Sequence, residues 1–463
     1  DIMEKQKVAA ETEITINEAR ENYRPPAGRG ALLFFLMVNL NKVHTFYQFS
    51  LNAYVAVFSR AIDLVSKPKK PKNPLLKLKM AVSRATKKFS WSVDVLKQAR
   101  AGGDFGGGGV PVPKNKEELD ERLKVLTESV QFTVVSYIRR GLFVVDKMTL
   151  ATQVTLWVLR KEGELPADEV GILISGKQTN TGASMSQLLA EWLPESAWLG
   201  LQALKEIKAF EKLPDDMDSS PEMWKRWYDL EKPELVDMPK EYKSMDEWKK
   251  IMVLRVVRPD RVTPAMSQFI KDRMGGRYID EEAFDMRACY NESGPSTPIF
   301  FVLFPGVDPT PDVEKLGDQL GFTEAKGNYV NISMGQGQEA PAEQGLDNFA
   351  KNGGWVFLQN IHLMAGWLPS LERKLEICAE TGHDDFRCFL SAEQPMFAGM
   401  PAPMVKSIPE AILQSCIKVA NEAPVDAKAN LRMAYANFSE DKWGPCGDDQ
   451  KKVSDCKNVL FAL

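Results

Sequence analysis

The sequence predicts an α/β region that lies between two helical regions. Four short apolar runs, at residues 299–304, 329–332, 355–358 and 386–390, are each followed by a turn and a stretch of helical character. Apolar strands that alternate with helices predict a parallel sheet with helices on both faces. The chain before Trp248 and after Pro409 shows helical patterning instead. The predicted order is therefore helical, then α/β, then helical.

Within the first helical region, residues 1–24 are charged and helix-favouring, and Pro25-Pro26 is expected to end that helix. A second helical stretch is expected from Arg29 to about Val65. Residues 66–100 carry eleven Lys or Arg against one acid, which favours a solvated, exposed insertion, although an acidic partner stays possible. Residues 102–113 are rich in glycine and predict a flexible loop.

Helical spacing returns from Lys116 to about Lys212, where leucines recur on one helix face. Residues 214–239 are rich in Pro, Asp and Ser and predict a linker. Trp224, Trp227 and Trp248 in and near this linker indicate that it packs against the protein.

The composition excludes several classes of protein. The 59 Lys and Arg nearly balance the 63 Asp and Glu, so the chain as a whole is not a nucleic-acid binder. The longest apolar run, residues 31–38, is far shorter than the roughly 20 residues of a membrane span. The charged start, residues 1–5, does not resemble a secretory signal. We therefore expect neither a membrane protein nor a secreted one.

Cysteine and histidine spacing argues against metal and redox chemistry. The six cysteines show no C-x2-C pair, and the three histidines stand at no metal-ligand spacing. We expect free thiols in a reducing compartment and no metal site.

Two glycine motifs resemble nucleotide-binding loops. Gly171 to Lys177 matches G-x-x-x-x-G-K, but its interior is stiff and apolar, and Gln178 stands where a hydroxyl would bind Mg²⁺. The turn at Gly335–Gly337 is followed by an acid and a proline, which favours a structural turn over a dinucleotide site. An enzyme that uses Lys177 or this turn remains the alternative interpretation.

The strand ends at 304 and 358 predict a degenerate nucleotide site. The turn after the first strand is rich in proline, which has no N–H, and contains an acid but no lysine. Neutral amides follow the third strand, where an active ATPase would carry acids for Mg²⁺ and water. The predicted positions are Pro305, Gly306, Asp308 and Thr310 for the phosphate loop, and Gln359 and Asn360 for the Walker-B position. We expect no catalytic residue and no metal ligand.

The sequence resembles the dynein heavy chains, which are microtubule motors. The segments that carry the resemblance include PGVDP at 305–309, GQGQ at 335–338 and WVFLQNIHL at 355–363, and others lie at 19–25, 29–30, 47–51, 140–143, 146–147, 254–255, 258–261, 297–301 and 421–424. Their order matches the family across nearly the whole chain. Residues 316–317, 320–323, 335–339 and 359–363 are closer to the axonemal outer-arm type than to the cytoplasmic form.

The resemblance implies a piece of a longer polypeptide, from the end of the fifth AAA+ module of the motor ring through most of the sixth. Residues 1–215 would form the helical small subdomain of the fifth module, and 216–240 a linker. Residues 241–405 would form the P-loop-like α/β large subdomain of the sixth module. Residues 406–463 would begin its helical small subdomain, and the sixth module of the family does not bind nucleotide.

The resemblance also implies a function. The whole chain would be an ATP-driven, minus-end-directed microtubule motor for ciliary and flagellar beating, located in the cytoplasm and the axonemal cytoskeleton. This segment would be mechanical, and ATP and Mg²⁺ would bind in other modules. Its expected partners are the other AAA+ modules, the stalk and buttress, the C-terminal domain, and other dynein heavy, intermediate and light chains. Microtubules would bind through the stalk, and no nucleic acid or membrane partner is expected.

Overall fold

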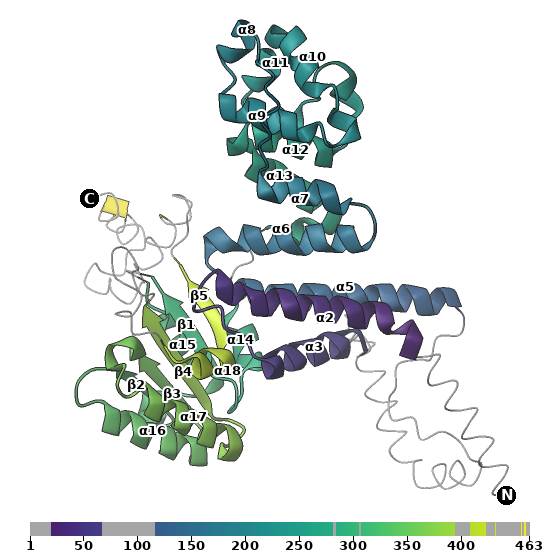
Figure 1. The fold of residues 1–463 in the computed structure, drawn as a ribbon. Helices are drawn as coiled ribbons and strands as arrows, with labels where there is room; N and C mark the ends of the chain where they lie inside the picture. The colour runs from purple at the N-terminus through teal and green to yellow at the C-terminus, as the bar shows by residue number, and fades with distance from the viewer. Residues whose placement is uncertain are drawn as a thin grey trace, which may run out of the picture. The chain divides into compact units, whose positions relative to one another are not determined.

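The computed structural model describes residues 20–66, 116–280, 284–304, 307–393 and 408–422, together with 431, 455, 458 and 459 (Figure 1). Its internal contacts divide the chain into two units. The helical unit takes residues 1–44, 49–139 and 145–282, and the α/β unit takes residues 45–48, 140–144 and 283–463. The predicted helix over 1–19, the rest of the basic stretch after Ser66, and the glycine-rich loop lie outside the described residues.

The helical unit begins with long helices: α2 (Arg24–Asn39), α3 (Leu51–Ser66), α5 (Lys116–Arg140) and α6 (Val144–Lys161). Pro25 and Pro26 occupy the first turn of α2, where a missing N–H costs nothing. The chain is helical at 20–22 and turns at Tyr23, so the expected break is present and the prolines also start the next helix. The stretch expected from Arg29 to Val65 is two helices, separated by the 3-10 helix η1 (Leu40–Lys42) and a loop.

Shorter helices complete this unit. They are α7 (Ala167–Ser175), α8 (Gln187–Ala190), α9 (Glu195–Leu204), α10 (Leu213–Ser219), α11 (Pro221–Tyr228), α12 (Glu247–Val257) and α13 (Val262–Met274), with 3-10 turns at Lys208–Phe210, Pro233–Leu235, Lys240–Ser244, Pro259–Arg261 and Gly276–Tyr278. The stretch expected to be a linker contains α11, and Trp224 packs edge-on against Trp227 with ring centroids 6.0 Å apart. Both indoles are buried, so this stretch packs as expected.

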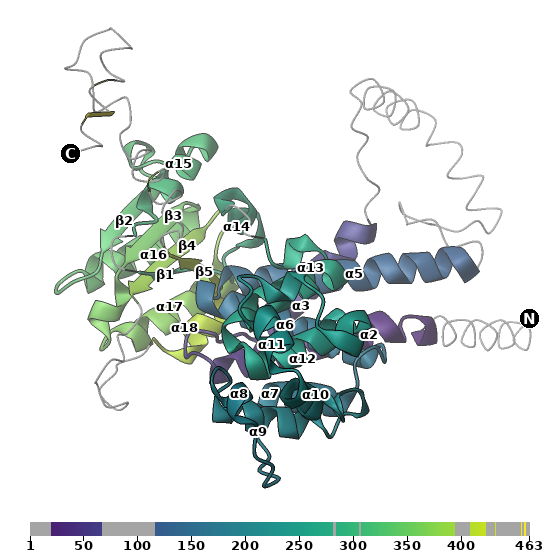
Figure 2. The ribbon, with the colours of Figure 1, turned by 90° about the horizontal axis from the view of Figure 1, so that it is seen from above.

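The α/β unit contains a five-stranded sheet in the order β2-β3-β4-β1-β5, and every strand pair is parallel. The strands are β1 (Ile299–Leu303), β2 (Tyr329–Ser333), β3 (Trp355–Gln359), β4 (Arg387–Glu393) and β5 (Ile417–Asn421). The helices are α14 (Met286–Glu292), α15 (Thr310–Leu320), α16 (Glu339–Asn352), α17 (Leu368–Thr381) and α18 (Glu410–Ser415), with 3-10 turns at Glu324–Lys326 and Ile361–Met364 (Figures 1 and 2). The predicted parallel α/β fold and its four predicted strands are confirmed.

Strand β5 corrects the expectation of helix from residue 406 onwards. Ile417 pairs with Ile299, and the pairing continues to Asn421 opposite Leu303. The strand was missed because Lys418 interrupts its short apolar run. The contacts also group α12 and α13 with the helical unit, although both lie within the range 241–405 expected for the α/β subdomain. Which ring modules the two units represent stays a prediction.

Two short segments from the N-terminal part of the chain belong to the α/β unit. Phe143 packs edge-on against Phe304, just after β1, with ring centroids 5.2 Å apart, and its N–H donates to the Tyr47 hydroxyl at 3.0 Å. The N–H of Val144 donates to the Glu422 carboxylate at 2.8 Å, next to the end of β5. Residues 143 and 144 therefore contact the ends of β1 and β5, although they precede the first residue of the sheet by more than 150 positions.

The core of the sheet is built around Trp355, which is fully buried at the start of β3. Phe322 stacks on its ring at a centroid distance of 4.8 Å, and Phe389 and Tyr290 pack against it at 5.1 and 5.2 Å. Gly317 on α15 makes this packing possible. A Cβ there would lie 2.5 Å from the Phe322 carbonyl oxygen and 3.3 Å from the Trp355 ring.

Replacing Gly317 with Ala should destabilise the α/β unit by about 1–3 kcal/mol, because the backbone at Phe322 or the indole must move. The matched control is Gly345→Ala on α16, where a Cβ would meet Val330 at an ordinary 3.5 Å. Helix propensity predicts that this control gains up to about 1 kcal/mol. Urea unfolding, followed by ¹⁹F NMR of 5-fluorotryptophan at Trp355, measures both. Equal stabilities would contradict the close-packing argument.

Candidate functional site

The carboxyl ends of parallel strands meet at one edge of a sheet, and here that edge carries a chain of hydrogen bonds. The side-chain amide of Gln359, at the end of β3, donates to the Thr310 hydroxyl at 2.8 Å. Thr310 in turn donates to the Asp308 carboxylate at 2.5 Å. The structure thus brings together three of the six positions predicted for a degenerate nucleotide site. Pro305 and Gly306 lie outside the described residues.

The N-terminus of α15 has few amides left for a phosphate. The N–H of Thr310 donates to Asp308 at 2.9 Å, and those of Asp312 and Val313 donate to the Pro309 carbonyl at 3.1 and 3.2 Å. Pro311 has no N–H at all. A phosphate loop depends on free N–H groups at this place. The described N–H groups at the start of α15 therefore already have acceptors within the chain.

The charges near α15 are also unfavourable for an anion. Burial raises the pKa of the Glu314 carboxyl, and the nearby negative charges of Glu324, Asp308 and Asp318 raise it further. A site for triphosphate needs positive charge instead, usually from a lysine and Mg²⁺. The raised pKa of Glu314 thus reports a group of acids beside α15.

Asn360, the second predicted Walker-B position, lies beyond the strand. Its backbone is left-handed, with φ +56°, a conformation that asparagine tolerates, and its N–H donates to the Ser391 hydroxyl at 3.1 Å. The sequence interpretation missed Ser391 because it ended the fourth strand at Leu390, whereas β4 continues to Glu393. In the sequence, Ser391 and Ala392 directly follow Leu390 without a turn residue, and this continuation was the signal that could have placed Ser391 at this edge.

His362 caps the end of β4. Its Nδ1 accepts the N–H of Glu393 at 3.2 Å. Burial lowers the pKa of His362, while the Glu393 charge acts in the opposite direction. A neutral ring is what this acceptor role requires.

The described residues give no support for metal or disulfide chemistry. Among them, no group of three or more His, Cys, Asp or Glu could hold a metal ion. The four described cysteines are free and buried, at positions 289, 378, 388 and 416. No helix in the described ranges is long and apolar enough to cross a membrane.

The structure agrees with the sequence argument against a phosphate loop at Gly171 to Lys177. Gly171 lies inside helix α7, and Gly176 is its left-handed C-cap with φ +58°. A phosphate loop instead joins a strand to the start of a helix. Lys177 forms an ion pair with Glu206. The alternative of an enzyme that uses Lys177 therefore has no phosphate loop at this motif.

The second glycine motif forms a turn between β2 and α16. Gly337 has φ +86°, and the N–H of Gln338 donates to the Gly335 carbonyl at 3.0 Å. Strand β2 is at the edge of the sheet, and Glu339 occupies the first turn of α16. This geometry agrees with a strand-to-helix turn.

Comparison with known proteins identifies the family of the chain. The model of the dynein heavy chain region D6 P-loop domain matches residues 294–420, which include the whole hydrogen-bond chain. The full chain is 40% identical to the flagellar outer-arm dynein alpha chain of Chlamydomonas reinhardtii. It is 38% identical to human dynein axonemal heavy chain 9 and 37% identical to the flagellar outer-arm dynein beta chain of Chlamydomonas reinhardtii, again over its full length. The chain belongs to the dynein heavy chain family.

This dynein segment spans only about a tenth of these relatives, 11% of the alpha chain and 9% of the other two. The matched residues 294–420 include β5 except for its last residue, Asn421. The resemblance noted in the sequence is confirmed.

A second polar group in the dynein segment was missed from the sequence. Lys418 in β5 is 2% exposed, and its ammonium donates to the carbonyls of Leu413 at 2.8 Å and Cys416 at 3.3 Å. Burial lowers the pKa of Lys418 to about 7, and Cys416 acts in the opposite direction. The lysine thus caps the C-terminal end of α18. It does not line the cavity described below.

The hydrogen-bond chain should contribute coupled stability. Thr310→Val and Gln359→Leu should each cost about 1 kcal/mol, and the double variant should cost less than their sum by about 0.5–1.5 kcal/mol. Urea unfolding with the ¹⁹F signal of Trp355 gives the values. Thr381→Val is the control, since its hydroxyl bonds only to its own helix at Ile377. Additive effects would show that the Gln359–Thr310 bond contributes nothing.

Lys418 should make the stability of the α/β unit depend on pH. The folded pKa is about 7 and the unfolded one near 10.5, so above pH 7 the unfolded chain binds more protons and stability rises with pH. Relative to Lys418→Met, the unmodified chain should gain about 1.6 kcal/mol between pH 7 and 8.5. Below about pH 6 the difference should be constant. Urea midpoints at pH 6, 7 and 8.5 test this, and parallel curves for both proteins would refute it.

Proposed function

We propose that this chain is a mechanical segment of the motor ring of an axonemal outer-arm dynein heavy chain. The segment would run from the end of the fifth AAA+ module through most of the sixth. The complete heavy chain would be an ATP-driven, minus-end-directed microtubule motor for ciliary and flagellar beating. It would act in the axoneme of the cilium or flagellum.

The hydrogen-bond chain from Gln359 through Thr310 to Asp308 carries the proposal that this segment does not hydrolyse nucleotide. ATP hydrolysis needs a free amide cradle, a cation at the β- and γ-phosphates, and carboxylates that hold Mg²⁺ and water. At this edge the amide donates to the hydroxyl, the hydroxyl donates to the carboxylate, and the carboxylate also holds an α15 amide. The polar groups thus satisfy one another, which supports a structural edge over a catalytic one.

A mechanical role follows from the same features. The polar groups at this sheet edge already hydrogen-bond to one another, so they need no ligand as a partner. The α/β unit would then keep one conformation and move as a rigid body. Motion would then pass through this segment as a shift between packed subdomains. The buried Trp355 cluster and the bordering residues Tyr47 and Phe143 support a stiff α/β unit.

The cofactors and partners in this proposal lie outside the segment. ATP and Mg²⁺ would bind in other modules of the heavy chain. The segment would contact neighbouring AAA+ modules, the stalk and buttress, and the C-terminal domain. Other heavy, intermediate and light chains would join the complex, and microtubules would bind through the stalk.

Millimolar Mg-ATP should leave the melting temperature of this chain unchanged within about 1 °C. A ligand present at 100 times its Kd would stabilise the folded state by about 2.7 kcal/mol, which corresponds to a shift of several degrees. Differential scanning fluorimetry with and without 5 mM Mg-ATP measures the shift. A rise of several degrees would overturn the proposal. Lys177→Ala should behave like the unmodified chain, whereas lost ATPase turnover in this variant would restore the alternative enzyme.

A further inference from the structure

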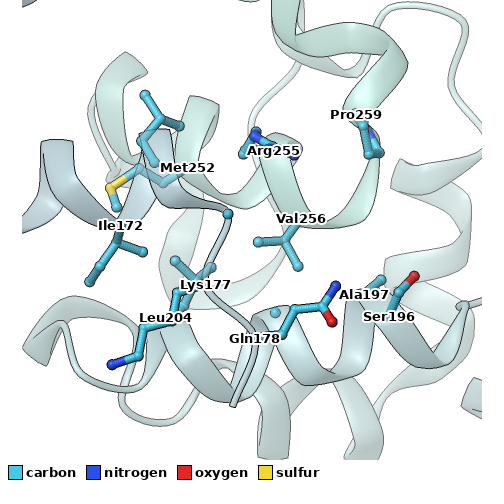
Figure 3. Close-up of a pocket in the computed structure, with 13 residues that line it drawn as sticks. Ile172, Lys177, Gln178, Ser196, Ala197, Leu204, Met252, Arg255, Val256 and Pro259 are labelled. Carbon is cyan, nitrogen blue, oxygen red and sulfur yellow. The ribbon is translucent and has the colours of Figure 1, made fainter.

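The helical unit contains a small cavity that the proposed motor function does not use. Its volume is about 120 Å³, and it lies between the end of α7, one face of α9 and one face of α12 (Figure 3). Aliphatic and polar groups both line it, and the aliphatic side chains include Ile172, Leu173, Leu204, Met252 and Val256. An apolar cavity of about 150 Å³ can hold a benzene molecule. The space therefore fits one hydrocarbon group of side-chain size.

Arg255 supplies the charge at this cavity. It is half-buried and has no hydrogen bond or ion pair with any residue that the structure describes. Lys177, on the same lining, is already paired with Glu206. Its nitrogens keep access to water and have no carboxylate partner among the described residues, so an anion can bind to them. The cavity thus offers one unmatched cationic group beside an apolar surface.

The guanidinium lies over the end of α7. A Cβ at Gly176 would be 2.9 Å from Nη2 of Arg255, so the two groups are in close contact at this C-cap. Gln178 and Ser196 add an amide and a hydroxyl to the lining from two other segments (Figure 3). The start of α9 contributes little, because Glu195 stands in its first turn. The recognition chemistry rests on Arg255.

We propose that this cavity binds a short apolar monocarboxylate, with its hydrocarbon group between α9 and α12 and its carboxylate on Arg255. Arginine binds a carboxylate through two parallel N–H donors, and this planar match is stronger than a single contact. One unpaired cation beside an aliphatic lining favours a monoanion with a hydrocarbon tail over phosphate. The carboxylate could be a free acid or the C-terminus of a polypeptide that ends in an aliphatic residue.

The test uses the whole 463-residue chain with ¹³C-methyl labels on Ile, Leu, Val and Met. The probe is 4-methylpentanoate, and the control is the neutral 4-methylpentanamide of the same shape. We expect saturable methyl shifts at Ile172, Met252 and Val256 with the acid, and binding at least tenfold weaker with the amide. No saturable shift up to 20 mM acid, or equal binding of the amide, would overturn the proposal.

Variants separate the guanidinium from the cavity. Arg255→Met should weaken binding of the acid at least tenfold, whereas Arg226→Met, at an exposed arginine of α11 outside the lining, should change it by less than twofold. The methyl spectrum without probe shows whether each variant is folded. If Arg255→Met does not fold, the acid and amide comparison on the unmodified chain still decides. Unchanged binding by a folded Arg255→Met would refute the role of the guanidinium.

The source of the carboxylate is tested with N-acetyl-alanyl-leucine, which carries its carboxylate on a leucine at a peptide end. Binding tighter than that of 4-methylpentanoate identifies a polypeptide C-terminus as the ligand. Binding of the free acid alone identifies a small molecule. Failure of both probes contradicts the proposal, and it leaves the proposed motor function untouched because the two sites lie in different units.

Discussion

The packing of Trp355 is the constraint on which the α/β unit depends. This indole sits at the start of β3, where Phe322, Phe389 and Tyr290 surround it, and Gly317 lets α15 come close. Strand β3 is thereby held against α15 at one end. Its other end carries Gln359, whose amide reaches the first residue of the same helix. A hydrophobic cluster and a polar contact thus fix one strand and one helix at both ends, which sets the geometry of the edge between them.

That edge differs from an ATP site in where its polar groups point. In an active site such polar groups have no hydrogen-bond partner within the protein, and the bound ligand supplies that partner. Here a hydroxyl, an amide and a carboxylate are used within the chain, and acids surround the helix. The fold of a P-loop domain is kept, and these polar groups bond to one another within the chain.

The sequence predicted the fold better than it predicted the site. Four strands were found because their apolar runs are continuous, which is the pattern of a sheet covered on both faces. Strand β5 was missed because Lys418 breaks its run, and only the structure shows two carbonyls that accept the buried ammonium. The site residues were located by their positions after strands. The link between Gln359 and Thr310 was not predictable, since it joins side chains 49 positions apart and depends on how two turns fold. The match at Lys177 was set aside correctly, because the stiff apolar residues inside the motif belong to helix α7 and not to a loop.

The bonding of Val144 to Glu422 has a consequence for biosynthesis. These residues are 278 positions apart, and β1 has neighbours in β4 and in β5, the last strand that the structure describes. On a ribosome, residues 45–48 and 140–144 emerge long before the strands they border. The sheet cannot close until β5 has left the exit tunnel, so aromatic residues such as Phe143 stay uncovered for much of translation. Long-range closure of this type is slow and exposes apolar surface. We expect this stretch of the nascent chain to be a place where chaperones bind.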